Sequence, residues 1–389
     1  MTALLARLLG RMPVGWLQLT HNYGRLASAV AGVAFANVLV FVQLGIMGSM
    51  NTATRDTYKM LNADIILSAK DANTISEGSN VPRQWMFRAM SDPGVADATP
   101  LYMGSVQWKQ NGNDTKLQLL AMDPVKTGFF SPQVRHKIVS LTLPDVAMID
   151  LKTRQIDQQV LAGIRPHSPL TTEIMGHTIS FADTFTGGVG FSADGYVLTS
   201  DQTFLRLFPQ RQSGAPNHIL LKLAPGHDAA AVIDRLRADL PSDLRIRTIA
   251  QAADDDVVFS TTKRPTGIIF GFGVLMGVLV GIVIVYQVLS TDVADHLKEY
   301  ATFKAMGYAP GFFLGIIFEE AMILALLGFV PGSLVSWGVH SLLRTATGLP
   351  INMDGTVVFL VFLGTLAACA VSGAVATRRL NAADPADLF

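Results

Sequence analysis

The stretch DVADHLKEYATFKAMGYAP, residues 292–310, is a short charged segment between two long apolar runs. Read as a helix, it has one apolar face with charged side chains around the remainder. Such a helix suits docking on a partner protein or a membrane surface, and a solvated loop between two helices is the alternative. A glycine followed three residues later by a proline ends it. The residues that carry the face, the charges and the end are Val293, Leu297, Tyr300, Glu299, Lys304 and Gly307.

The composition is that of a membrane protein with a substantial soluble part. Half of the 389 residues are hydrophobic, only 15% are charged, and the mean hydropathy is +0.36. The net charge of zero gives no indication of nucleic acid or another polyanion as a partner. The single cysteine, Cys369, lies in an apolar run, which excludes an intrachain disulfide and argues against a cysteine-based metal site.

Four runs are long enough to cross a bilayer, which takes about 20 residues. They cover residues 26–54, 265–291, 321–343 and 355–377, and the third extends forward across Glu319 and Glu320. The predicted parts are an amphipathic N-terminal helix at 1–25, spans at 26–50, 265–291, 311–343 and 355–377, a soluble domain at 51–264, the charged segment at 292–310, a short loop at 344–354 and a tail at 378–389. The positive charges beside the spans give only a weak orientation preference.

The soluble domain mixes strand-like and helix-like patterns, which predicts an α+β domain. Strands are expected at residues 64–69, 95–110, 116–121, 177–181, 196–199 and 218–223, and helices at 83–90, 201–208 and 228–240. The glycine-rich stretch 184–195 is either a mobile loop that contacts a partner or a plain turn. The three acids at 254–256 are expected at a solvated helix start, because their spacing does not suit calcium.

Two features of the spans are candidates for a functional role. Gly273, Gly277 and Gly281 recur every four residues in the second span, which lets two helix backbones approach closely. That face serves either self-association or packing against another span of the same chain. Glu319 and Glu320 are acids within an apolar run, and such acids are either functional, as in a proton relay, or hydrogen-bonded within the bundle.

The sequence lacks the motifs of an enzyme. It contains no G-x-x-x-x-G-K-S/T loop, so the chain has no phosphate-cradling loop of its own. It also has no G-x-S-x-G, H-E-x-x-H or paired-cysteine motif. The chain is therefore expected to be a non-catalytic subunit with no cofactor.

The charged segment and the tail resemble the FtsX and MacB permease family of mechanically coupled ABC transporters. The family pattern E-I-G-x-x-K-A-L-G-A corresponds to EYATFKAMGY at residues 299–308, with alanine at 301 in place of the usual glycine. The family also ends on a basic pair, then Asp-Pro and a final leucine. The matching residues are Arg378, Arg379, Asp384, Pro385 and Leu388.

Three further stretches resemble the DevC-type permeases, namely those that begin HNYGRL at residue 21, LNADI at 61 and PLYMGSVQWK at 100. The resemblance implies an α-helical membrane protein with four transmembrane helices and a large α+β periplasmic domain, in a bacterial inner membrane, with both termini cytoplasmic. It implies a homodimer, a separate ATPase subunit that binds ATP and magnesium, a membrane-fusion adaptor and a TolC-like outer-membrane duct.

The function that this resemblance implies is export or efflux driven by movement, in which the segment 292–310 takes up the motion of the ATPase. Two alternatives stay open: a regulatory scaffold like FtsX that controls a cell-wall hydrolase, and a lipoprotein-release permease like LolC or LolE. An adaptor gene beside this one would support export, whereas a hydrolase gene would support regulation.

Overall fold

The computed structural model describes residues 14–110, 112–188, 190–296, 302, 306–308 and 310–382. The chain divides into two compact units. We call residues 1–48, 268–346 and 351–389 the helical unit, and residues 49–267 with 347–350 the sheet unit. Each is described by itself.

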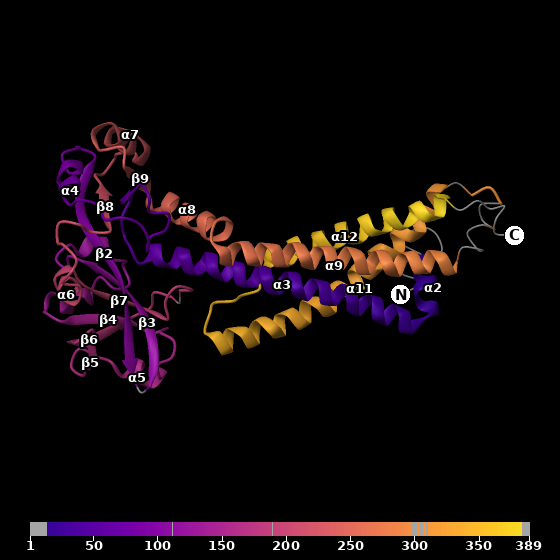
Figure 1. Cartoon of the computed structure of the whole chain (residues 1–389), viewed down its shortest axis with the longest axis horizontal. Helices are drawn as coiled ribbons and strands as arrows, with labels where there is room; N and C mark the ends of the chain where they lie inside the picture. The colour runs from indigo at the N-terminus through magenta and orange to yellow at the C-terminus, as the bar shows by residue number, and fades with distance from the viewer. Residues whose placement is uncertain are drawn as a thin grey trace. The chain divides into compact units, whose positions relative to one another are not determined.

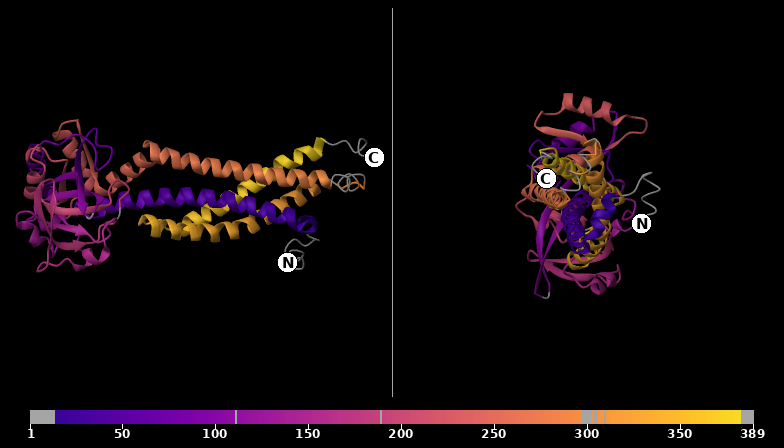
Figure 2. Two further views of the ribbon diagram at one scale, coloured as in Figure 1. Left: turned by 60° about the horizontal axis from the view of Figure 1, so that its bottom comes forward. Right: turned by 90° about the vertical axis from the view of Figure 1, so that its right-hand side faces the viewer.

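The helical unit consists of long apolar helices. Its described elements are α2 (Val14–His21), α3 (Tyr23–Lys59), α9 (Pro265–Asp295), α11 (Pro310–Thr347) and α12 (Gly355–Ala382), of which α3 and α9 also supply residues to the sheet unit. Within the described residues, four helices are long and apolar enough to cross a membrane. Helices α3 and α9 run side by side (Figures 1 and 2). The predicted fold class, four membrane helices with a mixed α/β domain, is confirmed.

Helix boundaries differ from the predicted spans at the charged segment. Helix α9 continues to Asp295, so the first four residues of segment 292–310 form its last turn and do not begin a separate helix. Pro310 is the first residue of α11, a position where its missing N–H costs no helical hydrogen bond. At 37 residues, α3 is about 55 Å long, well beyond the roughly 30 Å of bilayer hydrocarbon. Its last turns, from Ser49 on, belong to the sheet unit.

The sheet unit is built on one mixed sheet. Its described strands are β1 (Ile65–Ala69), β2 (Val95–Gln110), β3 (Asn113–Met122), β4 (Val146–Asp150), β5 (Leu170–Ile174), β6 (His177–Phe185), β7 (Gly195–Ser200), β8 (His218–Leu223) and β9 (Leu244–Thr248). The order among these is β5-β6-β4-β7-β3-β2-β8-β1-β9. Strands β3 and β7 pair parallel, as do β4 and β6, and the remaining pairs are antiparallel.

Strand β2 joins the two halves of this sheet. Its first part pairs with β8 and its second part with β3. Short helices pack on both halves: α4 (Gln84–Ala89), α5 (Gln158–Gly163), α6 (Asp201–Leu207), α7 (Ala229–Asp239) and α8 (Ile249–Thr262), with 3-10 turns η1 (Thr127–Phe129) and η2 (Ile138–Thr142). One buried cluster lies around Trp108 and Phe181 and another around Ile65 and Val232, while a third, which includes Ile66 of β1 and Met148 of β4, spans both halves.

The three acids at 254–256 were expected at a solvated helix start, and this prediction is wrong. Helix α8 begins at Ile249 with a capping box, in which Thr248 and Gln251 satisfy each other's backbone N–H groups. The acids therefore lie in the middle of α8, and Asp256 is only 4% exposed. This local capping box, with its Thr-x-x-Gln pattern at 248–251, places the helix start five residues upstream of the acids.

The glycine-rich stretch connects β6 to β7 and is tied to the sheet by buried polar groups. Asp150, at the end of β4, accepts hydrogen bonds from the N–H of Gly188 at 2.9 Å and of Lys152 at 3.0 Å. Gly188 has φ +110°, which L side chains rarely adopt. On the C-terminal side of position 189, the Arg154 guanidinium donates hydrogen bonds to the carbonyl oxygens of Gly190 and Ala193. The stretch is thus held at the described residues on both sides of position 189.

We expect the stability of the sheet unit to depend on Asp150 between about pH 4 and pH 6. Burial raises the pKa of its carboxyl to about 6, although the backbone hydrogen bonds oppose that shift. The unfolded chain loses this proton near pH 4, whereas the folded chain keeps it until about pH 6. The free energy of unfolding is therefore highest below pH 4, where both states hold the proton. This contribution is lost as the pH rises through 6, and it amounts to about 3 kcal/mol at most.

The measurement is hydrogen exchange of β4 amides in the full chain, wild type against Asp150→Asn, across this pH range. The variant should show a lower opening free energy at pH 4, because one acceptor is lost, and a flatter pH dependence. Parallel curves for the two proteins would contradict the assignment.

Candidate functional site

The end of α9 that leads into the charged segment is fastened to the start of α3. The guanidinium of Arg25 lies 2.6 Å from Asp295 and 3.7 Å from Asp292. His296, one turn after Asp292, places its Nδ1 3.6 Å from the same carboxylate. Because Asp292 is only 2% exposed, the Arg25 guanidinium offsets part of the cost of burying its carboxylate. The segment therefore begins from a fixed point on α3.

Glu319 and Glu320 lie where the short helix α2 packs on α11. A carboxylate oxygen of Glu319 accepts a hydrogen bond from the N–H of Trp16, 3.4 Å away, in the first turn of α2. A carboxylate at a helix N-terminus satisfies donors that the helix leaves free. Gly15 lies so close to Glu320 that an added Cβ would be 2.9 Å from its Cγ. Glu319 is thus hydrogen-bonded within the bundle, one of the two alternatives left open for these acids.

Glu320 is fully buried and faces Asp292 of α9. Neither oxygen of Glu320 has a hydrogen-bond donor among the described residues. Two carboxyl groups from α9 and α11 therefore meet next to the Arg25 guanidinium and the His296 ring. The sequence alone did not show Asp292 as a third buried acid, because it stands in a charged stretch.

The six residues predicted to couple the chain to an ATPase divide into three groups in the structure. Val293 differs from the expectation, because its side chain is 2% exposed and packs with Leu19 and Ile316 inside the helical unit. It is not on a surface open to a partner. Gly307 has φ +89° and follows a helical hydrogen bond from Met306 to Thr302, as a C-terminal glycine does. Leu297, Glu299, Tyr300 and Lys304 lie outside the described residues.

The glycine stripe of α9 packs against α3 of the same chain. An added Cβ would lie 2.5 Å from Gln43 at Gly273, 2.9 Å from Val40 at Gly277 and 3.2 Å from Ala36 at Gly281. An added Cβ would clash at Gly277, would displace the end of the Gln43 side chain at Gly273 and would be unusually tight at Gly281, so the glycines permit this close approach. The offset Gly271 has no such neighbour within 4 Å. The stripe therefore makes a contact within one chain, one of the two alternatives left open.

In the sheet unit, the last turns of α3 are joined to α8 and β7 by hydroxyl hydrogen bonds. The Tyr58 hydroxyl donates to Asp256 across 3.2 Å, and the hydroxyls of Thr57 and Tyr196 are 2.7 Å apart. Asp256 also accepts from the N–H of Ile75 and from Ser260. Burial raises the pKa of Asp256, and these donors hold its carboxylate in place. We call this group the α3–α8 junction.

Sequence reasoning missed Arg25, Asp292 and His296, as well as the junction. A signal existed for Asp292 and His296, because their spacing of four residues puts them on one helix face. None existed for the pairing of Arg25 with Asp295, 270 positions apart in the chain. In the parts of the chain that the structure describes, no three His, Cys, Asp or Glu side chains gather as metal ligands would.

Comparison with known proteins identifies the C-terminal part of the chain. Residues 271–385 match the family described as FtsX-like permease C-terminal. No curated protein matches the sequence.

Among solved structures, half of the chain (50%) is similar to 93% of the periplasmic region of MacB from Actinobacillus actinomycetemcomitans, with 8% identity and a TM-score of 0.34. The extracellular domain of the noncanonic ABC-type transporter YknZ from Gram-positive bacteria is similar over 98% of its own length to 48% of this chain, with 8% identity and a TM-score of 0.32. A domain of a permease protein from Porphyromonas gingivalis matches 49% of the chain and 89% of its own length, with 13% identity and a TM-score of 0.28.

We expect Gly277→Leu to destabilise the helical unit, because the new side chain meets Val40 and forces α3 away from α9. Overpacking of this kind costs about 1–3 kcal/mol. Gly271→Leu is the matched control, since the same change on the same helix meets open space. Thermal unfolding in detergent should show a lower Tm for Gly277→Leu only. If Gly277→Leu unfolds like wild type and only dissociates dimers, the stripe serves contacts between chains instead.

Proposed function

We propose that this chain, whose residues 271–385 belong to the FtsX-like permease C-terminal family, is the membrane subunit of an ATP-driven ABC exporter that works by transmitting movement. A separate ATPase subunit binds ATP and magnesium, because the sequence has no phosphate-cradling loop. The segment 292–310 receives the motion of that subunit, and α3 with α9 carries it to the sheet unit.

The observation that carries the proposal is the fastening of α3 to α9 and to α8. In the helical unit, Arg25 binds the last turn of α9, and the glycine stripe brings the two helix backbones together. In the sheet unit, Tyr58 and Thr57 bind α8 and β7. A displacement at residue 296 therefore cannot be absorbed by sliding of α9 along α3 without breaking these contacts. Close-packed helices transmit such displacement because their interiors deform little.

The spans offer little to a polar substrate that would pass between them. The cavity among α3, α9 and α12 is lined by apolar side chains apart from Asn37 and Thr365. This supports a role in which the helices move and the substrate is handled by the soluble domain. By family resemblance the spans lie in the inner membrane, the soluble domain is periplasmic, and that domain works with a membrane-fusion adaptor and a TolC-like duct.

A homodimer is part of the proposal, and we propose for its contact a surface other than the glycine stripe, which packs against α3 in the single chain. The outward face of α9 is apolar and exposed in the single chain, with Ile269 at 65%, Phe272 at 61% and Val283 at 58%. In a membrane this face contacts lipid or a second copy. It lies on the same helix that the ATPase would drive, so a dimer contact there would couple the two subunits.

Substitutions in segment 292–310 should separate two effects: binding of the ATPase subunit, and the link between transport and ATP hydrolysis. With the co-expressed ATPase subunit, Leu297→Asp combined with Tyr300→Asp should lose co-purification, since a buried apolar contact is worth about 2–4 kcal/mol, or tens- to hundreds-fold in affinity. Glu299→Lys should keep the complex but lose transport-linked stimulation of ATP hydrolysis, because interface charges fix register more than affinity. The chain alone should hydrolyse no ATP.

The control for the double variant is Val125→Asp with Val139→Asp, which introduces the same charges at exposed sites of the sheet unit. This control should bind the ATPase like wild type. Full binding and full export by the Leu297 and Tyr300 variant would show that the segment is only a loop.

The α3–α8 junction should matter for coupling more than for stability. Tyr58→Phe removes the hydroxyl that joins α3 to Asp256, at a cost of about 1 kcal/mol. Tyr102→Phe is matched, because it removes one tyrosine hydroxyl bond, to the Ser213 carbonyl, elsewhere in the sheet unit. Both variants should unfold at similar temperatures, but only Tyr58→Phe should lower export per ATP hydrolysed. Equal export by the two variants would remove the junction from the proposed route.

A further inference from the structure

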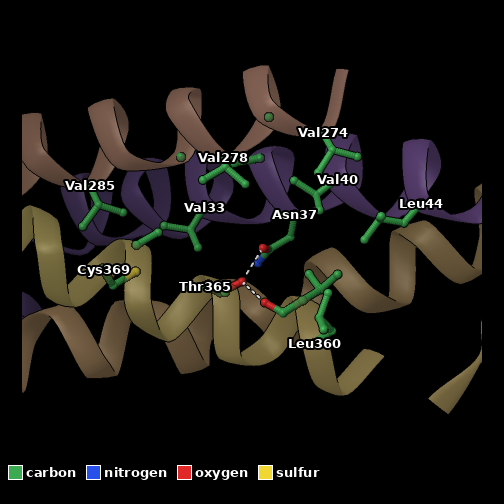
Figure 3. Close-up of a pocket in the computed structure, with 16 residues that line it drawn as sticks. Val33, Asn37, Val40, Leu44, Val274, Val278, Val285, Leu360, Thr365 and Cys369 are labelled. Atoms are coloured by element: carbon green, nitrogen blue, oxygen red, sulfur yellow. Dashed lines mark hydrogen bonds between the residues drawn. The ribbon is translucent and has the colours of Figure 1, made fainter. Parts of the chain in front are cut away.

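A cavity of about 150 Å³ lies in the helical unit between α3, α9 and α12 (Figure 3). Its walls are mostly valine, leucine, alanine and glycine side chains. Val278 of α9 and Leu360 of α12, both lining residues, are 37% and 62% exposed. The cavity is therefore open on the side of these two residues, which in a membrane faces lipid.

Asn37 brings one polar group to this apolar cavity. Its side-chain oxygen accepts a hydrogen bond from the Thr365 hydroxyl at 2.6 Å, and Thr365 also bonds the carbonyl oxygen of Val361 (Figure 3). The Asn37 amide nitrogen has no hydrogen-bond partner among the described residues, although Asn37 is only 5% exposed. A buried donor without an acceptor costs about 1–3 kcal/mol, so the site is incomplete as it stands.

Water is a poor occupant of this space. A buried water needs two to four polar partners, and cavities of about this size with apolar walls stay dry and take up small apolar molecules such as benzene. Here the walls present only the Asn37 amide, because the single hydroxyl proton of Thr365 is already shared between the Asn37 side-chain oxygen and the Val361 carbonyl oxygen. An occupant with an apolar body and one hydrogen-bond acceptor satisfies both parts of the wall.

The depth of Asn37 in the membrane restricts the class of ligand that can reach it. It lies about 16 Å along α3 from residue 26 and the same distance from residue 48, because each helical residue rises 1.5 Å. That is roughly half the thickness of the hydrocarbon core. The ester groups of ordinary phospholipids lie at the membrane surface and do not reach this depth, so the acceptor belongs to a molecule dissolved in the hydrocarbon.

We propose that the cavity between α3, α9 and α12 binds a compact, membrane-dissolved amphiphile, an apolar ring or short chain with one hydroxyl, ether or carbonyl oxygen that accepts from the Asn37 amide. The molecule enters from the lipid between Val278 and Leu360. Gly277 and Gly281 also line the cavity, so an occupant contacts the same two helices that the glycine stripe holds together. This binding does not depend on the proposed export function.

The test is photolabelling of the full chain in lipid nanodiscs with two matched probes. One is a trifluoromethyl-phenyldiazirine that carries a para hydroxymethyl group, and the other is its parent without that group. Adducts are mapped by mass spectrometry and expressed for each probe as cavity labelling relative to labelling of the outer face of α9. We expect this ratio to be about five- to tenfold higher for the hydroxymethyl probe, as one hydrogen bond provides, and to fall with excess benzyl alcohol.

Three variants make the result decisive. Gly364→Leu fills the cavity from a lining position where an added Cβ meets nothing within 4 Å, and it should abolish cavity labelling by both probes. Gly338→Leu on α11 is the matched control at an equally open glycine outside the cavity, and it should label like wild type. Asn37→Leu should keep the labelling by the parent probe and remove the preference for the hydroxymethyl probe.

Labelling spread evenly over the lipid-facing helices and unchanged by Gly364→Leu would overturn the proposal. Absence of cavity adducts with either probe, as expected if a second copy fills the space, would also overturn it. A preference for the hydroxymethyl probe that survives Asn37→Leu would remove Asn37 from the site.

Discussion

The close approach of α3 and α9 is the constraint on which the rest of the helical unit depends. Three glycines one turn apart remove the side chains that would keep the helices apart, and polar and apolar atoms of α3 fill the space. In lipid the hydrophobic effect does not drive helices together, so van der Waals contact over such a stripe is a main source of association. The pairing of Arg25 with Asp295 then fixes the register of the two helices.

Buried polar groups in this bundle are placed where helices meet, and each has a distinct role. Glu319 completes the first turn of α2, and His340 of α11 lies 3.2 Å from the backbone oxygen of Phe41 on α3. Asn37 joins α3 to α12 through Thr365. Such groups are costly in a membrane unless they are paired, so they specify which helix faces which neighbour. Asn37 combines this structural contact with an unpartnered amide nitrogen beside a cavity.

Local sequence patterns were sufficient for the spans and for most strands, but not for the sites. The apolar runs of the spans and the apolar or β-branched runs of β1, β2 and β8 are visible in short windows. Strands β4, β5 and β9 were missed because their patterns are ambiguous: VAMID is buried at every position, LTTEI is largely exposed at a sheet edge, and LRIRT contains two arginines that pair with Asp255. The α3–α8 junction and the Arg25 cluster join residues far apart in sequence, which no window reveals.

Arg154 holds together three separate stretches of the sheet unit. Its guanidinium forms an ion pair with Asp194, bonds carbonyl oxygens of the glycine-rich stretch, and lies 3.4 Å from the carbonyl oxygen of Thr347, the last residue of α11. Thr347 belongs to the sheet unit although the rest of the described part of α11 belongs to the helical unit. Each of these hydrogen bonds is worth about 1 kcal/mol. Loss of this one side chain would therefore weaken the attachment of the glycine-rich stretch and of residue 347 at the same time.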